Sequence, residues 1–382
     1  MPHRHPHADH HRHAHPAMPV APEDAVTPEL MFCVEMGMVM RSRRLKHASA
    51  TSLVDEIVQR LKHYAIAAHA RPGSSRRESH KDWTVLEDLK IPDSANHRFG
   101  IKIVSPMFLF ARHDSWAPKL EKILSVLNYD FETSISHQCA THVHVVPARG
   151  AWTLDEAKSL ASTAIYFERC FDALMPPYRR KMVWAKSNRF SRYLGKLSLA
   201  ECLEGIRKRV GSFPALVDIM NTCGAHSPTG VALGSSQDFY HEGYRWNFGG
   251  APNGYGTIEF RQPPGVTDSS EATKWIMLVG CFVMLSCTHY VKAKERPSLV
   301  GLGRWVRYQA RLCRFPEEHI DSLRRLFNQA DQVHVADGAG RDASTISTGD
   351  ATRLRWISSH DNGGAQKYQA MMNHRRARGH PA

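Results

Sequence analysis

Six short segments of the chain have the residue types and the spacing of β-strands. The first is almost wholly apolar and dense in Met, Val and Phe, whereas in others, such as 141–147, polar residues alternate with apolar ones. This alternation places successive side chains on opposite faces of a sheet. The six segments are 30–40, 82–88, 99–105, 141–147, 244–248 and 257–262. A turn dipeptide, Asn253-Gly254, lies between the last two, so they are expected to pair through a loop.

Helical spacing of apolar residues covers most of the intervening chain. In the first such segment, Val54, Ile57 and Leu61 recur at intervals of three or four, after Ser49 or Thr51, either of which is a suitable N-cap. Pro118 suits the first turn of another helix. The expected helices are 49–69, 118–127, 153–175, 197–209, 214–221, 268–292, 297–312 and 317–333.

The order of these elements predicts an α+β domain built on an antiparallel sheet with flanking helices. Several strands are close enough in sequence to form hairpins, and their alternation favours sheets with one solvated face. No G-x-G-x-x-G or G-x-x-x-x-G-K-[ST] motif stands at a strand–helix junction, which excludes the Rossmann and P-loop classes.

Composition divides the 382 residues into three parts. Residues 1–27 are rich in His, Pro and Ala, and they are predicted to be a disordered arm that binds transition metals only adventitiously. Residues 335–382 are predicted to be a disordered basic tail, with a solvated tail preferred over a nucleic-acid arm. Residues 28–334 are expected to form the folded domain.

The net charge indicates which kinds of partner the protein binds, and the cysteines indicate the redox state of its compartment. The net charge of +13 favours anionic partners such as nucleotides or phosphorylated substrates. No recognition helix, aromatic stacking motif or zinc module supports nucleic-acid binding. The 8 cysteines form no C-x-x-C pair, which is typical of free thiols in a reducing compartment. With no apolar signal peptide, the cytoplasm is the expected location.

The longest apolar stretch, from Trp275 to Val291, is shorter than the roughly 20 residues that span a membrane. It is expected to be a buried core helix, so no membrane association is predicted.

Three of the expected strands carry ionisable residues in unusual places. Glu35 lies inside an apolar strand, His142 and His144 share one strand face, and Glu259 shares a face with Arg261. A buried carboxylate must be paired or bound to a metal. Two carboxylates and an imidazole that converge on one face would suit Mg²⁺ or Mn²⁺. The alternatives are ion pairs between Arg261 and either glutamate, and a hydrogen-bonded histidine pair.

Six motifs follow one another in an order that is similar to the amidoligase family, which is common in fungi and bacteria and belongs to the glutamine-synthetase-like superfamily. The motifs are Phe32–Gly37, Trp83–Asp88, Ile101–Pro106, Cys139–His144, Pro177–Arg180 and Thr257–Arg261, followed by Gly265, Asp268 and Trp275. The resemblance covers about residues 30–295. It implies a curved antiparallel sheet of the glutamine-synthetase type, with an ATP-and-metal site on its concave face.

The implied reaction is ATP-dependent amide formation. ATP phosphorylates a carboxylate, and an amine attacks the resulting acyl phosphate. The substrates implied are small-molecule or peptide carboxylates and amines, and the cofactors are ATP and Mg²⁺ or Mn²⁺. The oligomeric state is left open.

The resemblance also assigns roles to individual residues. Glu35, His142 and Glu259 match the metal ligands that hold ATP, and Arg261 matches the arginine that stabilises the transferring phosphoryl group. Further candidates for contact with a substrate or nucleotide are His144, Asn247, Asp88, Arg179 and Arg180.

Three positions depart from the family pattern. Gly37 and Lys102 replace carboxylates of a second metal site, and Ala140 replaces a glycine. In one interpretation, Lys102 supplies a fixed positive charge in place of the second cation, and the enzyme uses one metal. In the other, the domain is a catalytically inactive relative that binds a nucleotide or a partner protein.

Overall fold

The protein is described here by a computed structural model. It describes residues 28–70, 81–91, 96–180, 182–191, 193–195, 197–221, 243–251, 256–289, 291 and 296–330. The predicted arm, the predicted tail and the Asn253-Gly254 turn lie outside the described residues.

The described strands form one sheet, which supports the candidate site. They are β1 (Leu30–Ser42), β2 (Ala68–Ala70), β3 (Trp83–Glu87), β4 (Phe99–Val104), β5 (Phe108–Leu109), β6 (Phe131–Ser134), β7 (Thr141–Pro147), β8 (Trp246–Asn247) and β9 (Ile258–Phe260). Their order is β2-β3-β4-β1-β7-β9-β8, and β5 and β6 also pair with β1. All pairs are antiparallel except β2–β3, so the sheet is mixed rather than wholly antiparallel.

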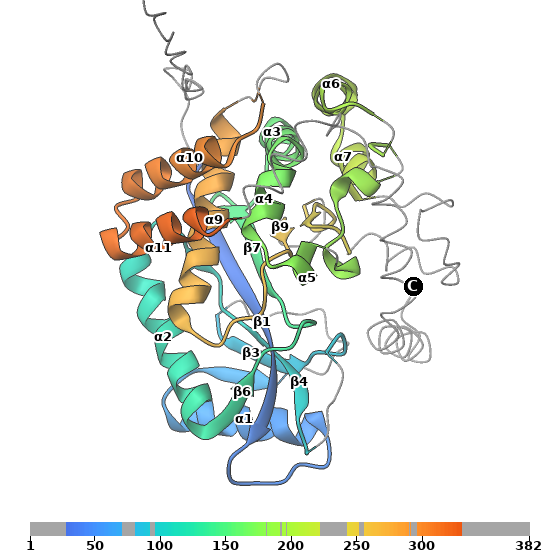
Figure 1. The fold of residues 1–382 in the computed structure, drawn as a ribbon. Coiled ribbons are helices and arrows are strands. Elements are labelled where there is room, and N and C mark those ends of the chain that lie inside the picture. Colours follow the sequence, from blue (N-terminus) through green and yellow to red (C-terminus); the bar gives the residue numbers. More distant parts are fainter. Residues whose placement is uncertain are drawn as a thin grey trace, which may run out of the picture.

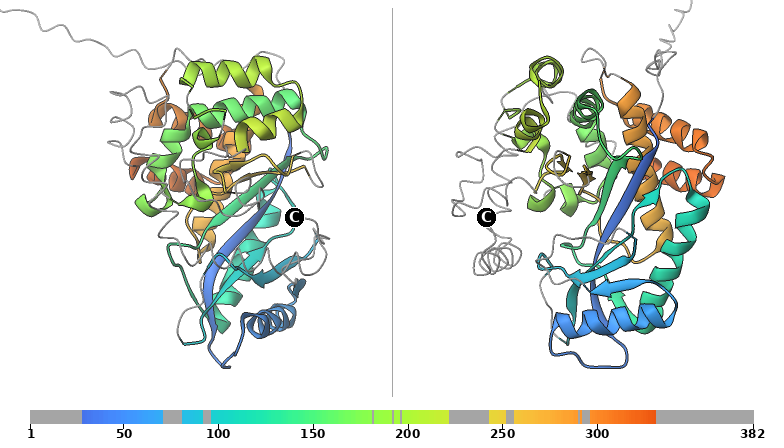
Figure 2. Two further views of the ribbon diagram at one scale, coloured as in Figure 1. Left: turned by 90° about the vertical axis from the view of Figure 1, so that its right-hand side faces the viewer. Right: turned by 180° about the vertical axis from the view of Figure 1, so that it is seen from behind.

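Strand β1 organises the sheet because it pairs with four other strands. Its 13 residues span about 43 Å at the usual strand rise, and it runs through the middle of the molecule in both views of Figure 2. Alternate side chains are at most 1% exposed and form one apolar row: Leu30, Phe32, Val34, Met36, Met38 and Met40. The opposite face of the same strand carries Glu35 and Gly37.

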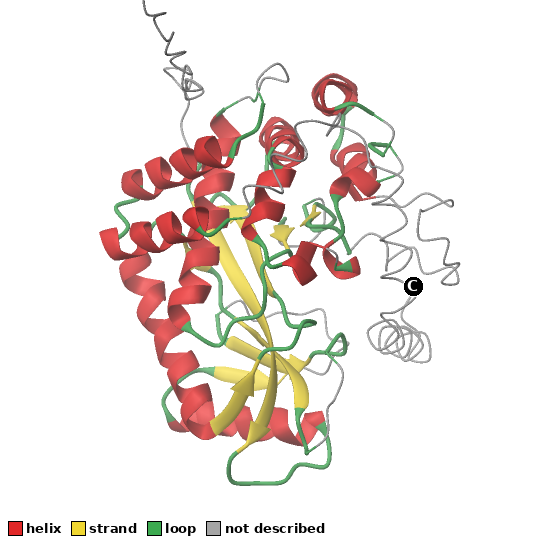
Figure 3. Cartoon of the chain, viewed as in Figure 1, coloured by secondary structure: helices red, strands yellow, loops and turns green. Residues whose placement is uncertain are grey.

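Helices surround the sheet, as Figure 3 shows by colour. They are α1 (Ala50–His63), α2 (His113–Asp130), α3 (Leu154–Tyr166), α4 (Glu168–Leu174), α5 (Pro177–Arg180), α6 (Leu199–Arg209), α7 (Phe213–Asn221), α9 (Ser269–Thr288), α10 (Leu299–Leu312) and α11 (Glu317–Asn328), with 3₁₀ turns at Val183–Ala185 and Asn188–Phe190. Helices α1, α2 and α9 contact the strands directly, and α2 and α9 run alongside each other in Figure 1. The α+β class predicted from the sequence is confirmed.

Local sequence explains most helix boundaries. Ser49 caps α1 by accepting from the backbone N–H of Ser52, and Thr153 forms a capping box with Glu156 at the start of α3. The predicted extension of α1 to residue 69 is wrong, because Ala65 takes a left-handed conformation with φ of 55°.

Other elements also differ from the predictions. Helix α2 begins at His113 and contains Pro118 in its second turn, not its first. The predicted helix 153–175 is broken at Phe167 into α3 and α4. The short strands β2, β5 and β6 were not predicted, because two to four residues carry too little periodicity to be recognised.

Helix α9 is the apolar stretch predicted to lie in the core. It is the one described helix long and apolar enough to cross a membrane by length and composition, yet 78% of its apolar window is buried within the protein. Gly280 on this helix packs directly against the ring of Phe110. The stretch is therefore a core helix in this fold.

Gly280→Ala is expected to lower the free energy of unfolding. Alanine normally stabilises a helix interior by about 1 kcal/mol relative to glycine, but here its Cβ would overlap the Phe110 ring. Overpacking of this kind costs about 1–3 kcal/mol. Urea denaturation should therefore show a net loss of stability.

Gly205→Ala in α6 is the matched control, because a Cβ there meets no heavy atom within 4 Å. This variant should be as stable as the parent or more so, by up to about 1 kcal/mol. Equal behaviour of the two variants would contradict the packing at Gly280.

Candidate metal and ligase site

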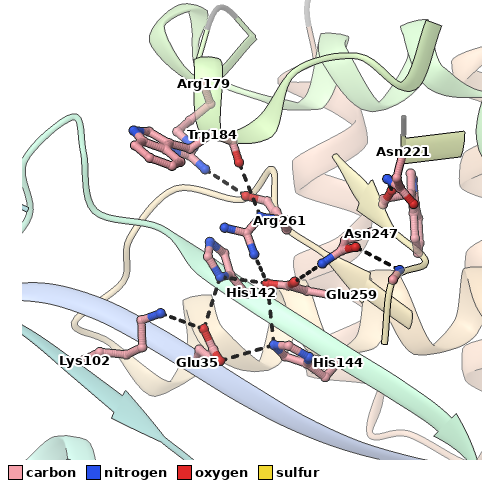
Figure 4. Close-up of polar contacts among 12 residues, drawn as sticks. Glu35, Lys102, His142, His144, Arg179, Trp184, Asn221, Asn247, Glu259 and Arg261 are labelled. Carbon is pink, nitrogen blue, oxygen red and sulfur yellow. Dashed lines mark hydrogen bonds and ion pairs between the residues drawn. The ribbon is translucent and has the colours of Figure 1, made fainter. Parts of the chain in front are cut away.

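The candidate site is a line of polar side chains across five neighbouring strands. The register places Lys102 of β4 opposite Gly37 of β1, and Glu35 of β1 opposite His142 of β7. On the other side, His144 of β7 lies opposite Glu259 of β9, and Glu259 lies opposite Asn247 of β8. Figure 4 shows these side chains pointing toward one another from the same face.

Glu35 is bound by side chains from both adjacent strands. The Lys102 Nζ lies 2.9 Å from its Oε2, and the His142 Nδ1 lies 3.2 Å from the same oxygen. The His144 Nε2 lies 3.4 Å from Oε1. The carboxylate therefore contacts one ammonium group and two imidazole rings.

Glu259 is bound in a similar way and is only 5% exposed. The Arg261 NH1 lies 2.5 Å and the His142 Nδ1 3.0 Å from its Oε1. Asn247 donates from Nδ2 to Oε2 over 3.1 Å. The His142 ring thus stands between the two carboxylates, and Arg261 pairs with Glu259 rather than with Glu35.

Electrostatics keep both carboxylates ionised. Burial favours the protonated form of Glu35, but Lys102 and the two imidazoles outweigh it and hold its pKa well below the ordinary value. For Glu259, burial is likewise outweighed by Arg261, His144 and His142, and its pKa is also well below the usual range. The site therefore presents two negative charges at neutral pH.

The pKa values of the two imidazoles are shifted in opposite directions by their surroundings. Burial and the charge of Arg261 lower the pKa of His142, despite its contacts with both carboxylates. His144 is also penalised by burial, but Glu259 and Glu35 outweigh that penalty and raise its pKa. At neutral pH, His142 is accordingly the better metal ligand of the two, because an imidazole must be neutral to bind a cation.

Glu35, His142 and Glu259 fit a divalent cation. One donor atom from each residue lies within 4.8 Å of the others. Ligands on opposite sides of Mg²⁺ stand about 4.2 Å apart, at twice the usual metal–oxygen distance. Two carboxylates and one imidazole suit Mg²⁺ or Mn²⁺ rather than a soft metal. Lys102 and Arg261 bond to the same carboxylates, so a bound cation would share these oxygens with them.

The position that the family resemblance gives to a second carboxylate is closely packed. A Cβ at Gly37 would lie 3.1 Å from Asp88 Oδ2 and 3.2 Å from Ile91 Cδ1. Burial lowers the pKa of Lys102, but Glu35 and, to a smaller extent, Asp88 raise it, and the net shift is upward. Asp88 therefore lies beside Gly37 and Lys102, at the end of the site away from Glu259.

Arg179 and Arg180 bond to backbone carbonyls. Arg179 is buried and donates to the carbonyls of Arg261 and Gln262 at 2.8 and 2.9 Å, and burial lowers its pKa to about 10. Arg180 donates from Nε to the carbonyl of Met175. In this structure Arg179 fixes the strand end that carries Arg261, whereas Arg180 is not part of the gathered cluster.

Trp184, which borders the site, and Lys90 beside it were not predicted from the sequence. The carbonyl of Trp184 accepts from Arg261 Nε at 3.3 Å, which helps to orient the guanidinium toward Glu259. The Lys90 Nζ lies 5.0 Å from the centre of the Trp184 ring. No sequence signal marks this contact, because the two residues are far apart in the chain and neither belongs to a strand.

The described residues form an α+β fold with two carboxylates and two imidazoles gathered on one face of its sheet. Residues 28–283 match the family described as "Putative amidoligase enzyme", and the chain belongs to this family. This match supports a ligase enzyme.

The chain is similar to a crystal structure of a bifunctional glutathione synthetase from Pasteurella multocida, with 11% identity and a TM-score of 0.34. The similarity covers 90% of this chain and 52% of that one, so the chain spans about half the length of its neighbour. No curated protein matches the chain.

Lys102→Met is expected to strengthen Mn²⁺ binding. The ammonium group competes for Glu35 Oε2 and repels a cation, and two unit charges about 5 Å apart interact by about 3 kcal/mol at an effective dielectric constant of 20. Titration calorimetry at neutral pH should show at least about a tenfold lower Kd, which is about 1.4 kcal/mol.

Lys208→Met removes an exposed lysine that pairs with Glu204 on α6, and it should leave the Mn²⁺ affinity unchanged. Equal affinity in the parent and in Lys102→Met would show that the cation does not bind at Glu35.

Proposed function

We propose that this protein is an ATP-dependent carboxylate–amine ligase that works with one divalent cation. The observation that carries the proposal is the convergence of Glu35, His142 and Glu259 from three strands onto one face. Ionised carboxylates with little access to water, one buried and one half-buried here, are costly, and a nucleotide-bound cation would give these two a function. Membership in the amidoligase family supports the reaction class.

In the proposed site, Glu35, His142 and Glu259 would hold Mg²⁺ or Mn²⁺. The cation would neutralise charge on the ATP phosphates while a carboxylate substrate is phosphorylated. Arg261 stands against Glu259 and would stabilise the transferring phosphoryl group. Lys102 would supply the positive charge of the missing second cation, since its ammonium group bonds directly to Glu35.

The remaining candidates take supporting roles. Asp88, next to Lys102, would bind the attacking amine, and Asn247 would keep Glu259 oriented through its hydrogen bond. His144 would contact the nucleotide or substrate from β7. The proposed substrates are small-molecule or peptide carboxylates and amines.

A second candidate function is nucleotide binding without catalysis. It is favoured by Lys102 and Arg261, which already neutralise the two carboxylates, and by the close packing at Gly37. This candidate predicts that ATP raises the melting temperature while no ADP is released. Activity that appears only after Lys102→Glu would also favour it.

Glu259→Gln is expected to abolish amide formation. The change keeps the size of the side chain but removes one ligand charge and the charged partner of Arg261. Loss of such a group costs about 10²–10³-fold in rate. The assay would supply ATP, Mg²⁺ or Mn²⁺, and a panel of amino acids and dipeptides, and would measure both ADP release and the amide by mass spectrometry.

Glu271→Gln is the control, because Glu271 pairs with Lys274 on the surface of α9. It should retain the parent rate, and circular dichroism should show both variants folded. A Glu259→Gln protein as active as the parent would refute the site assignment.

A further inference from the structure

Four arginines gather where helix α10 packs against helix α11, outside residues 28–283 that match the family. Arg304, Arg307 and Arg311 follow one another at three- and four-residue intervals, which places them on one face of α10. Arg324 lies one turn before Phe327 on α11. Figure 1 shows the two helices side by side at the edge of the molecule.

Gly303 gives the Arg307 guanidinium its position. A Cβ at residue 303 would lie 3.0 Å from Arg307 NH1 and 3.1 Å from Cγ and Cδ1 of Phe327. The guanidinium therefore lies against the helix crossing, half-buried beside Phe327. A glycine in a helix interior costs about 1 kcal/mol relative to alanine, and here it makes room for this arrangement.

The charges of this group are not balanced. Glu317 Oε1 lies 3.5 Å from Arg311 Nε, and Asp321 Oδ1 lies 2.7 Å from Arg324 NH1. Among the described residues, no carboxylate lies within ion-pair distance of Arg304 or Arg307. Burial, together with the other three arginines, lowers the pKa of Arg307. Two carboxylates thus pair with two of the four arginines.

We propose that this arginine cluster (Arg304, Arg307, Arg311 and Arg324) binds the phosphate group of a phosphate monoester. The four arginines carry four positive charges, and Glu317 and Asp321 balance two of them. A dianionic phosphate group matches the two that remain. Guanidinium groups offer paired N–H donors with the spacing of phosphate oxygens. A single carboxylate would leave one positive charge unmatched. The fixed position of Arg307 lowers the entropy cost of binding.

The test is titration calorimetry on the full chain, with EDTA present so that no divalent cation occupies the candidate active site. The probes are inorganic phosphate, AMP, a phosphoserine peptide and its unphosphorylated form. The phosphate-bearing probes should bind and the unphosphorylated peptide should not. Comparing AMP with the phosphopeptide distinguishes a small metabolite from a modified polypeptide as the source of the phosphate.

Three variants localise the binding. Arg307→Gln should weaken it at least about tenfold, since hydrogen bonds to charged groups contribute about 1.5–3 kcal/mol. Gly303→Ala should also weaken it, by crowding the guanidinium without removing a charge. Arg325→Gln, on α11 next to Arg324 but outside the cluster, should bind like the parent.

A structural role for Arg307 predicts a different result. Arg307→Gln relieves repulsion, so its melting temperature should equal or exceed that of the parent, while an arginine needed for packing would lower it. Equal weakening by Arg307→Gln and Arg325→Gln, or no binding of any phosphate probe, would overturn the proposal. Ligase activity should be unchanged in all three variants, so the outcome is independent of the proposed function.

Discussion

Two carboxylates on one face of the sheet, the half-buried Glu35 and the buried Glu259, set the conditions that the centre of the protein must satisfy. An ionised group away from water is costly unless charges and hydrogen bonds compensate it. Lys102 and Arg261 supply those charges, and His142 links the two carboxylates. Most partners stand on neighbouring strands, so a register slip of one residue would turn Glu35 into the apolar face of β1.

Much of this arrangement follows from the sequence because strand alternation is a strong signal. A glutamate within an apolar strand, and two histidines two residues apart, had to lie on the face opposite the apolar row. The family resemblance added which strands meet. The convergence of Glu35, His142 and Glu259, and the pairing of Arg261 with Glu259, are both present in the structure.

Other contacts depend on distances that the sequence does not encode. Lys102 reaches Glu35 because β4 pairs with β1 in one particular register. The short strands β5 and β6 exist only as partners of β1. Arg179 looks like a phosphate-binding arginine in the sequence, yet its guanidinium holds two carbonyls of the segment after β9. Each of these depends on tertiary packing rather than on local propensity.

The position of β1 near the start of the chain affects folding during synthesis. Its apolar row contacts α9, which is synthesised much later because it lies near the far end of the folded region. During synthesis, Phe32 can pack early against Trp116 of α2, but the part of the row that α9 covers stays exposed while more than half of the chain emerges from the ribosome. Exposed apolar strands of this kind are prone to aggregate; pairing with β4 and β7 would protect the edges of β1, and early docking of α2 would limit the exposed apolar face until α9 arrives.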